Sequence, residues 1–143
     1  KGITAGALVR LIGAAVLVAI VLPWLHVILL GAVLVAYVCS VQGYAIKDGQ
    51  LLVLHPGWAS RYRLADLAEV RIDSLAIKSS IRLFGSGGLF GFIGIFRNSL
   101  LGRFQSWVND SSRAVMLRFG DKTIVVSPDD PEAFERTVKA SLK

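Results

Sequence analysis

The sequence predicts a mainly β domain, a small barrel or sandwich with a C-terminal amphipathic helix, behind an N-terminal membrane anchor of two helices. Three observations predict it. Of 143 residues 54% are hydrophobic, yet the formal net charge is +6. Residues 11–46 carry no Asp, Glu, Lys or Arg, whereas residues 47–143 have the charge content of an ordinary soluble domain. Turn signals then recur about every ten residues, which is typical of all-β chains.

Composition excludes disorder, a coiled coil and collagen. It also excludes a single soluble globule, because a charge-free apolar segment of this length exceeds what one small core can bury. We therefore expect an anchor over residues 1–42 and a folded domain over residues 43–143.

The anchor is predicted to cross the membrane twice. One helix over residues 11–42 would measure roughly 48 Å at 1.5 Å per residue, against a hydrocarbon core of about 30 Å. Pro23 cannot donate a hydrogen bond to the preceding turn and disfavours helix at the residue before it. Helices over about 5–22 and 24–42, joined as a transmembrane hairpin, follow from that break.

The positions of Lys and Arg beside the predicted transmembrane helices predict how the protein is oriented in the membrane. The expected tip, residues 23–26, has no Lys or Arg, whereas Lys1, Arg10 and Lys47 flank the other ends. The positive-inside rule then gives a multi-pass protein of the inner (cytoplasmic) membrane, with the domain and both termini in the cytoplasm. The lone Cys39 forbids an internal disulfide, which agrees with a reducing compartment. A cleaved signal peptide is disfavoured because the apolar run resumes after Pro23.

Short strands are predicted throughout the domain. Asp48-Gly49 between residues 44–47 and 50–55 is the strongest short hairpin signal. Alternating polar and apolar residues predict further strands over residues 61–64, 70–73, 115–119 and 123–127, with turns at Pro56-Gly57 and Gly120-Asp121.

The last segment predicts an amphipathic helix. Asp130 is a favourable N-cap, and Pro131 suits the first helical position. Acidic residues near the start and lysines near the end match the helix dipole. Phe134, Val138 and Leu142 recur every four residues, so one stripe is expected to face inward.

Three sequence features together resemble a known family. They are the run Tyr44–Leu51, the glycine pattern Arg82-x-x-Gly85-x-Gly87 with Gly91, Gly94 and Phe96, and the ending Ser127–Phe134. With six or seven strands and a final helix, residues 43–143 resemble the pleckstrin-homology (PH) fold, specifically the bacterial PH-like domains that follow N-terminal transmembrane helices. The resemblance implies a fold and a membrane-tethered setting but no reaction. Some members of that class form homo-oligomers.

Side chains for catalysis are scarce. His26 and His55 have no His, Asp or Glu cluster at ligand spacing beside them, and Cys39 falls in the expected membrane segment. The adjacent carboxylates Asp129 and Asp130 could form a catalytic pair, but their position at the start of the predicted helix is explained by helix capping. We therefore expect no enzyme, no catalytic or metal-binding residues, no cofactor and no small-molecule substrate. No nucleic-acid recognition module is legible either.

The segment from Gly85 to Phe96 is unusual because large apolar residues alternate with glycines. A phosphate-binding loop is disfavoured, since no Gly-Lys-Ser/Thr follows. Three interpretations remain: a glycine-kinked strand buried in the domain, a segment that dips into the membrane interface, or a protein–protein contact. Phe90, Phe92 and Phe96 are the candidate contact residues.

Basic residues supply the other candidates. From Gly43 onward, 14 Lys and Arg face 10 Asp and Glu, a balance that suits an anionic lipid surface. The residues singled out are Arg61, Arg63, Arg82 and Arg97. Lys47 with Arg61 and Arg63 matches the phosphoinositide-binding pattern of eukaryotic PH domains only loosely, so recognition of a specific headgroup is not predicted.

These observations favour a non-enzymatic, membrane-anchored domain that self-assembles into a homo-oligomer or binds a membrane protein partner. The alternative is a peripheral sensor of anionic lipid that uses the basic residues and the apolar glycine-rich loop. A third hypothesis, an enzyme or transport subunit, depends on Arg10 as an intramembrane charge. Arg10 would lie only about 7 Å from the start of its helix, within snorkelling distance of the headgroups.

Overall fold

The computed structural model describes residues 5–88 and 91–142. The chain divides into two compact units, Lys1–Val35 and Ala36–Lys143. Each unit is described by itself below.

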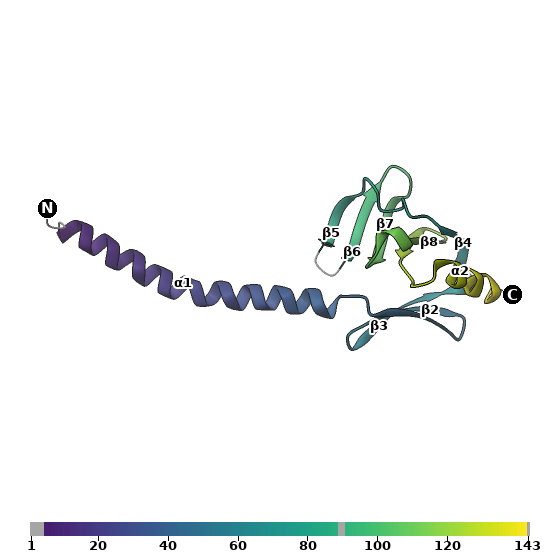
Figure 1. Cartoon of the computed structure of the whole chain (residues 1–143), viewed down its shortest axis with the longest axis horizontal. Helices are drawn as coiled ribbons and strands as arrows, with labels where there is room; N and C mark the ends of the chain where they lie inside the picture. Colours follow the sequence, from purple (N-terminus) through teal and green to yellow (C-terminus); the bar gives the residue numbers. More distant parts are fainter. Residues whose placement is uncertain (1–4, 89–90, 143) are drawn as a thin grey trace. The chain divides into compact units, whose positions relative to one another are not determined.

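The N-terminal unit is formed by one continuous helix, α1, over Ala5–Val38, with Pro23 inside it (Figure 1). The prediction of a two-helix hairpin is therefore wrong. A proline removes one hydrogen bond and favours a kink, but a reversal of the chain also needs turn-forming residues. Residues 23–26 are Pro-Trp-Leu-His and offer no Gly, Asn, Asp or Ser. His26 instead donates from Nδ1 to the carbonyl of Leu22 at 2.7 Å, within the helix itself.

The segment Val9–Val38 is long and apolar enough to span a membrane once. None of its most apolar stretch is buried inside the structure, so it is not a core helix of this chain. A helix that crosses once has its ends on opposite sides of a bilayer. The expectation of a multi-pass protein with both termini in the cytoplasm therefore loses its basis, because it depended on the hairpin.

The second unit begins with a three-stranded antiparallel sheet in the order β1-β2-β3, formed by Gly43–Lys47, Gln50–His55 and Trp58–Arg63. The predicted Asp-Gly hairpin is confirmed: Lys47 pairs with Gln50, and the two turn residues have positive φ values of 52° and 68°. Positive φ at both central positions is the backbone of the type I′ turn that suits a twisted hairpin.

The remaining six strands form a second sheet in the order β4-β8-β9-β7-β6-β5. Among the described strands of this sheet, β7 and β9 pair in parallel and all other neighbours pair antiparallel. The six strands are Leu67–Ile72 (β4), Ile81–Gly88 (β5), Gly91–Asn98 (β6), Gly102–Val108 (β7), Val115–Phe119 (β8) and Lys122–Val126 (β9). Short 3₁₀ turns over Leu64–Asp66 and Ser111–Arg113 connect strands. The described residues thus hold nine strands, more than the six or seven expected.

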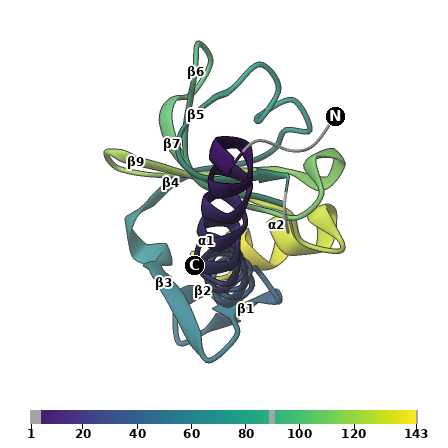
Figure 2. The ribbon, with the colours of Figure 1, turned by 90° about the vertical axis from the view of Figure 1, so that its left-hand side faces the viewer.

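The two sheets do not close into a barrel. The chain passes from β3 of one sheet to β4 of the other through the first 3₁₀ turn, and no strand belongs to both sheets. Figure 2 shows β1–β3 at one end of this unit and β5–β7 at the other. The open arrangement leaves each sheet with two edge strands, which a closed barrel would not have.

The main hydrophobic core gathers side chains from both sheets and from the C-terminal helix. Leu51 and Val53 come from the small sheet, and Trp107, Leu117 and Ile124 are among those from the large sheet. A second cluster combines Ala76 and Ile77 of the segment between β4 and β5 with Ala114, just before β8, and with residues of the large sheet, namely Phe96, Phe104, Val108 and Val125. Because β-strand side chains alternate between faces, both faces of the large sheet are apolar near its centre.

The C-terminal helix α2, Pro131–Ala140, begins as predicted. The Asp130 carboxylate accepts a hydrogen bond from the backbone N–H of Ala133 at 2.9 Å, and Pro131 occupies the first turn. Val138 is fully buried in the main core, and Phe134 packs against it. Leu142 lies beyond the end of the helix and is 44% exposed, so the inward stripe is shorter than expected.

Candidate interaction surface

The strand β5 forms one edge of the large sheet and has a partner, β6, on one side only. Three large apolar side chains on it are exposed: Ile81 by 71%, Leu83 by 53% and Phe84 by 76%. Soluble proteins usually protect such an edge with charges, proline or a covering segment, because its free backbone groups can pair with another strand. Here the edge strand is eight residues long, and its exposed apolar side chains lie in the first half, Ile81–Phe84.

Glycines determine the shape of this edge. Gly85 and Gly94 are paired across β5 and β6, with φ values of 109° and 136°. A Cβ on Gly85 would lie 2.2 Å from the carbonyl oxygen of Ile93, and one on Gly94 would lie 2.2 Å from that of Phe84. Only glycine allows this backbone approach. The pairing also shifts register between Arg82 and Phe84, which places Leu83 in a bulge.

Of the predicted apolar contact residues, Phe92 and Phe96 are less exposed than the large apolar side chains of β5. Phe96 is only 3% exposed and stacks on Phe104 in the second cluster, with ring centroids 6.0 Å apart. Phe92 is half-buried against the same cluster. Phe90 lies outside the described residues. For residues 91–96, the interpretation as a glycine-kinked, largely buried strand therefore agrees with the structure.

The four predicted arginines do not share one sheet. Arg82 on β5 and Arg97 on β6 are both exposed, with Arg97 directly opposite Ile81. Arg61 and Arg63 are exposed on β3 of the small sheet, where Arg63 forms an ion pair with Asp66 at 3.1 Å. Arg82 and Arg97 therefore flank the apolar edge, and Arg61 and Arg63 belong to a separate surface.

The residues that the sequence reasoning missed are Ile81, Leu83 and Phe84. Their signal was present, since the run Ile81–Phe84 places three large apolar residues around one arginine directly before the glycine pattern. Such a run is equally typical of a buried strand. Its exposure follows from the sheet order, because β5 comes last in the sheet and no described strand pairs with its outer side.

Comparison with known families agrees with this architecture. The model of the family described as bacterial PH domain matches residues 42–142. The chain belongs to the bacterial PH domain family. The resemblance noted from the sequence is thereby confirmed. No curated protein and no solved structure matches the chain. PH domains are generally non-catalytic, and no enzyme family is indicated.

In this PH domain, aromatic and polar side chains hold the segment that leads out of α1. Trp58 donates from Nε1 to the carbonyl of Val38, and His55 donates from Nδ1 to that of Ser40, each at 3.0 Å. Asn109 donates to the carbonyl of Val41 at 2.8 Å. These bonds satisfy carbonyls at the end of α1 and just after it, which have no partner within the helix. His55, 4% exposed, thus has a structural position, stacked on the Trp58 ring at 3.9 Å.

The Tyr44 hydroxyl links two further backbone segments in the same region of the PH domain. It donates to the carbonyl of Trp107 and accepts from the backbone N–H of Ser127. The Ser127 hydroxyl in turn accepts from the N–H groups of Asn109 and Asp110. Among the described residues, no group of three or more His, Cys, Asp or Glu could hold a metal ion.

Proposed function

We propose that this protein is a non-enzymatic interaction module that is held at a membrane by α1 and that self-assembles through the open edge of β5. The observation that carries the proposal is an eight-residue edge strand with three large apolar side chains exposed by 53–76%. An added strand would pair with the outer backbone groups of Ile81–Phe84 and cover these side chains at the same time. PH domains typically bind lipids or proteins, so an interaction role agrees with the family.

A second copy of the chain is the occupant that the strand itself supports. Two β5 edges related by a two-fold axis present the same apolar residues to each other, as an isologous interface requires. The strand carries a single charge, Arg82, so an antiparallel pair can keep the two arginines apart. Confinement of two anchored copies to one membrane would raise their effective concentration further.

The membrane is a poorer partner for the strand edge than another strand. Hydrocarbon offers no hydrogen bonds, so insertion of an open edge would leave its N–H and C=O groups unsatisfied at several kcal/mol each. This cost separates strand pairing from membrane insertion, although both would cover the same apolar side chains.

The experiment is the molar mass of the full chain in non-ionic detergent, measured by light scattering with the detergent contribution subtracted. We expect a dimer that Phe84→Arg and Ile81→Lys convert to monomer, because a charge at the seam opposes pairing. Leu100→Arg is the matched control, since Leu100 is equally exposed at 70% but lies in the turn between β6 and β7. A wild-type chain that stays monomeric at all concentrations would contradict the proposal, as would a dimer that survives the β5 substitutions.

The second candidate function is sensing of anionic lipid, and the exposed arginines favour it. Within the part of the chain that the structure describes, Arg82 and Arg97 form no ion pair, and they lie beside the apolar edge. Each basic residue near an anionic surface contributes about 1 kcal/mol. The additional candidates Arg61 and Arg63 belong to the small sheet, and Arg63 is already paired.

Lipid sensing is tested on the full chain in nanodiscs with and without phosphatidylglycerol, by hydrogen exchange of β5 and β6. Protection that appears only with the anionic lipid, falls with salt and is lost in the Arg82→Glu, Arg97→Glu double variant would support sensing. The Arg61→Glu, Arg63→Glu double variant tests the other surface. Protection that is independent of lipid charge would exclude sensing and leave strand pairing as the explanation.

A further inference from the structure

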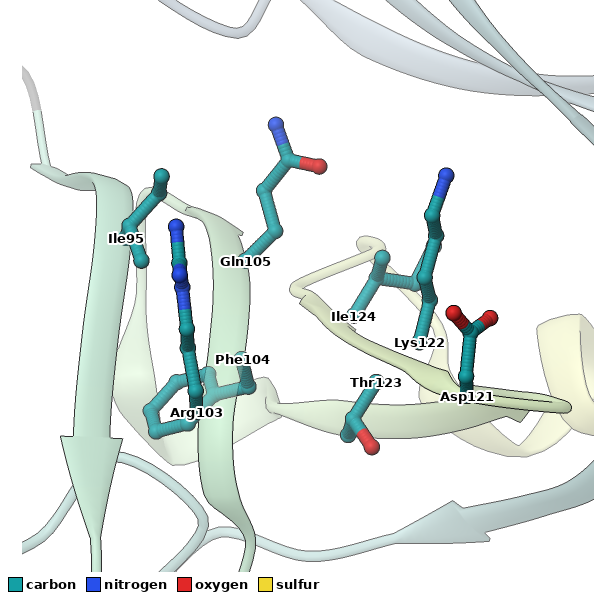
Figure 3. A pocket seen from close by; sticks show the side chains of 8 residues that line it. All are labelled: Ile95, Arg103, Phe104, Gln105, Asp121, Lys122, Thr123 and Ile124. Atoms are coloured by element: carbon teal, nitrogen blue, oxygen red, sulfur yellow. The ribbon is translucent and has the colours of Figure 1, made fainter.

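A pocket of about 350 Å³ opens on the large sheet between β6, β7 and β9. Its wall includes Ile95, Arg103, Gln105, Asp121, Lys122 and Ile124. In Figure 3, Arg103 and Gln105 rise from β7 on the same side as Lys122 and Ile124 of β9, whereas Phe104 and Thr123 point away. Strand alternation produces this arrangement, because every second residue faces the pocket.

Three cations form a row across neighbouring strands beside this pocket. Arg97 of β6 is the register partner of Arg103 of β7. The parallel pairing of β7 with β9 begins at Gln105 and Ile124, so Arg103 and Lys122 line the pocket from the two strands just before that pairing. Paired strands lie about 4.8 Å apart, and like charges directly opposite each other, such as Arg97 and Arg103, are destabilising. Among the described residues, none of the three has an ion-pair partner. A bound anion would remove this repulsion.

Hydrogen bonds fix the orientation of Gln105 at the pocket. Trp107 donates from Nε1 to the Tyr62 hydroxyl at 2.7 Å, and that hydroxyl lies 3.1 Å from Oε1 of Gln105. An indole N–H can only donate, so the Tyr62 hydroxyl accepts from Trp107 and donates its own proton to Oε1 of Gln105. Oε1 of Gln105 therefore already accepts a hydrogen bond, and the NH₂ group of the same side chain presents two donors. No described residue accepts a hydrogen bond from that NH₂ group.

We infer that this pocket binds a phosphate monoester, with Arg103, Lys122 and the Gln105 amide as its donors. Two cations and an amide rise on the same side of β7 and β9 (Figure 3), which suits a group with three acceptor oxygens better than a two-oxygen carboxylate. Asp121, in the turn before β9, is the one carboxylate in the lining and opposes the anion, so the pocket itself carries a net charge of +1. The apolar wall of Ile95 and Ile124 suits the carbon portion of an ester.

The site is separate from the β5 edge on which the proposed function depends. The pocket includes no residue of β5, and the two surfaces adjoin where Ile95 pairs with Phe84 and Arg97 pairs with Ile81. The ester could come from a soluble metabolite or from a phospholipid headgroup with a terminal phosphate, because both present three phosphate oxygens. The experiment below separates these two sources.

The test is calorimetric titration of the full chain in non-ionic detergent with glycerol 3-phosphate, and in parallel with micelles that contain phosphatidic acid or phosphatidylcholine. We expect saturable binding that Arg103→Gln weakens about ten-fold or more, since charge-assisted hydrogen bonds of this kind contribute about 1.5–3 kcal/mol each. Gln105→Glu keeps an acceptor for Tyr62 but replaces the NH₂ donors with an oxygen anion, so it should abolish binding without loss of fold. Asp121→Asn should tighten binding.

Arg61→Gln is the charge-matched control, because it removes one exposed arginine from the other sheet. Binding of glycerol 3-phosphate identifies a soluble ester as sufficient, and binding to phosphatidic acid micelles alone identifies the headgroup. Absence of saturable binding to either probe would overturn the inference. An equal loss of affinity in Arg61→Gln and Arg103→Gln would also overturn it, because it would show a diffuse charge effect and no built site.

Discussion

At the scale of single residues, two glycines set how closely β5 and β6 approach. Gly94→Ala places a methyl group where the carbonyl oxygen of Phe84 lies only 2.2 Å away, at a φ of 136°. We expect a loss of at least about 2 kcal/mol in the free energy of unfolding, measured by urea denaturation.

Gly49→Asn is the control for that substitution. Gly49 also has a positive φ, 68°, but a Cβ there would meet nothing within 4 Å, and asparagine tolerates the left-handed region. Its effect should stay within about 1 kcal/mol. A similar loss in both variants would show that φ alone, and not the close approach, makes Gly94 necessary.

The buried phenols make a pH prediction at the same scale. Burial raises the pKa of Tyr62 above its ordinary value of 10.0, against a hydrogen bond from Trp107 that lowers it. Burial also raises the pKa of Tyr44, and the Asp129 charge adds to the rise, whereas Ser127 and Arg113 oppose it. Because both folded-state pKa values are raised, the stabilisation from the neutral phenols is complete below pH 10 and is lost as the pH rises through the folded-state values.

Absorbance titration near 295 nm should therefore show phenols that ionise later in the folded chain than in guanidinium. Tyr62→Phe should remove one late-titrating group from the folded curve. Folded and unfolded titrations that superimpose would contradict the prediction.

At the scale of elements, the start of α2 depends on one carboxylate. Asp130→Ala removes the acceptor for the Ala133 N–H, and we expect a loss of about 1 kcal/mol in the free energy of unfolding. Asp129→Ala is the neighbouring control. The Asp129 side chain is fully exposed and pairs only with Arg113 at 3.0 Å, so its loss should cost less than about 0.5 kcal/mol by the same measurement. Equal losses would assign the effect to charge near the helix and not to the cap.

Adjacent residues were enough to predict this helix and the first hairpin, but the prediction that Pro23 ends a helix was wrong. The Asp-Gly turn and the Asp-Pro helix start each depend on a few adjacent residues with restricted backbone angles. Whether a proline ends a helix or only kinks it depends on the residues on both sides, and here long apolar helix-forming runs continue through it.

At the scale of the whole molecule, the domain should fold without its helix. Every residue of the two hydrophobic clusters lies at Val41 or later, and none of the apolar window of α1 is buried. We expect a chain of residues 36–143 to unfold in one cooperative transition at the temperature found for the full chain in detergent. Loss of cooperativity in the shortened chain would show that α1 contributes to the fold.

The open edge of β5 bears on that same measurement. If it pairs two copies, the shortened chain should show a thermal midpoint that rises with protein concentration, because dissociation then accompanies unfolding. Phe84→Arg should remove this dependence.

The sequence by itself determined the mainly β class with its C-terminal helix, the family, the long apolar N-terminal segment, and the local elements whose signals are adjacent residues. Periodicity and turn chemistry are short-range, so one chain is enough to read them. Only the tertiary structure decided which strands lie at an edge, which face each arginine occupies, and that Arg103, Gln105 and Lys122 line one pocket. Those facts depend on pairing between residues far apart in the chain, above all the parallel contact of β7 with β9, which no local pattern encodes.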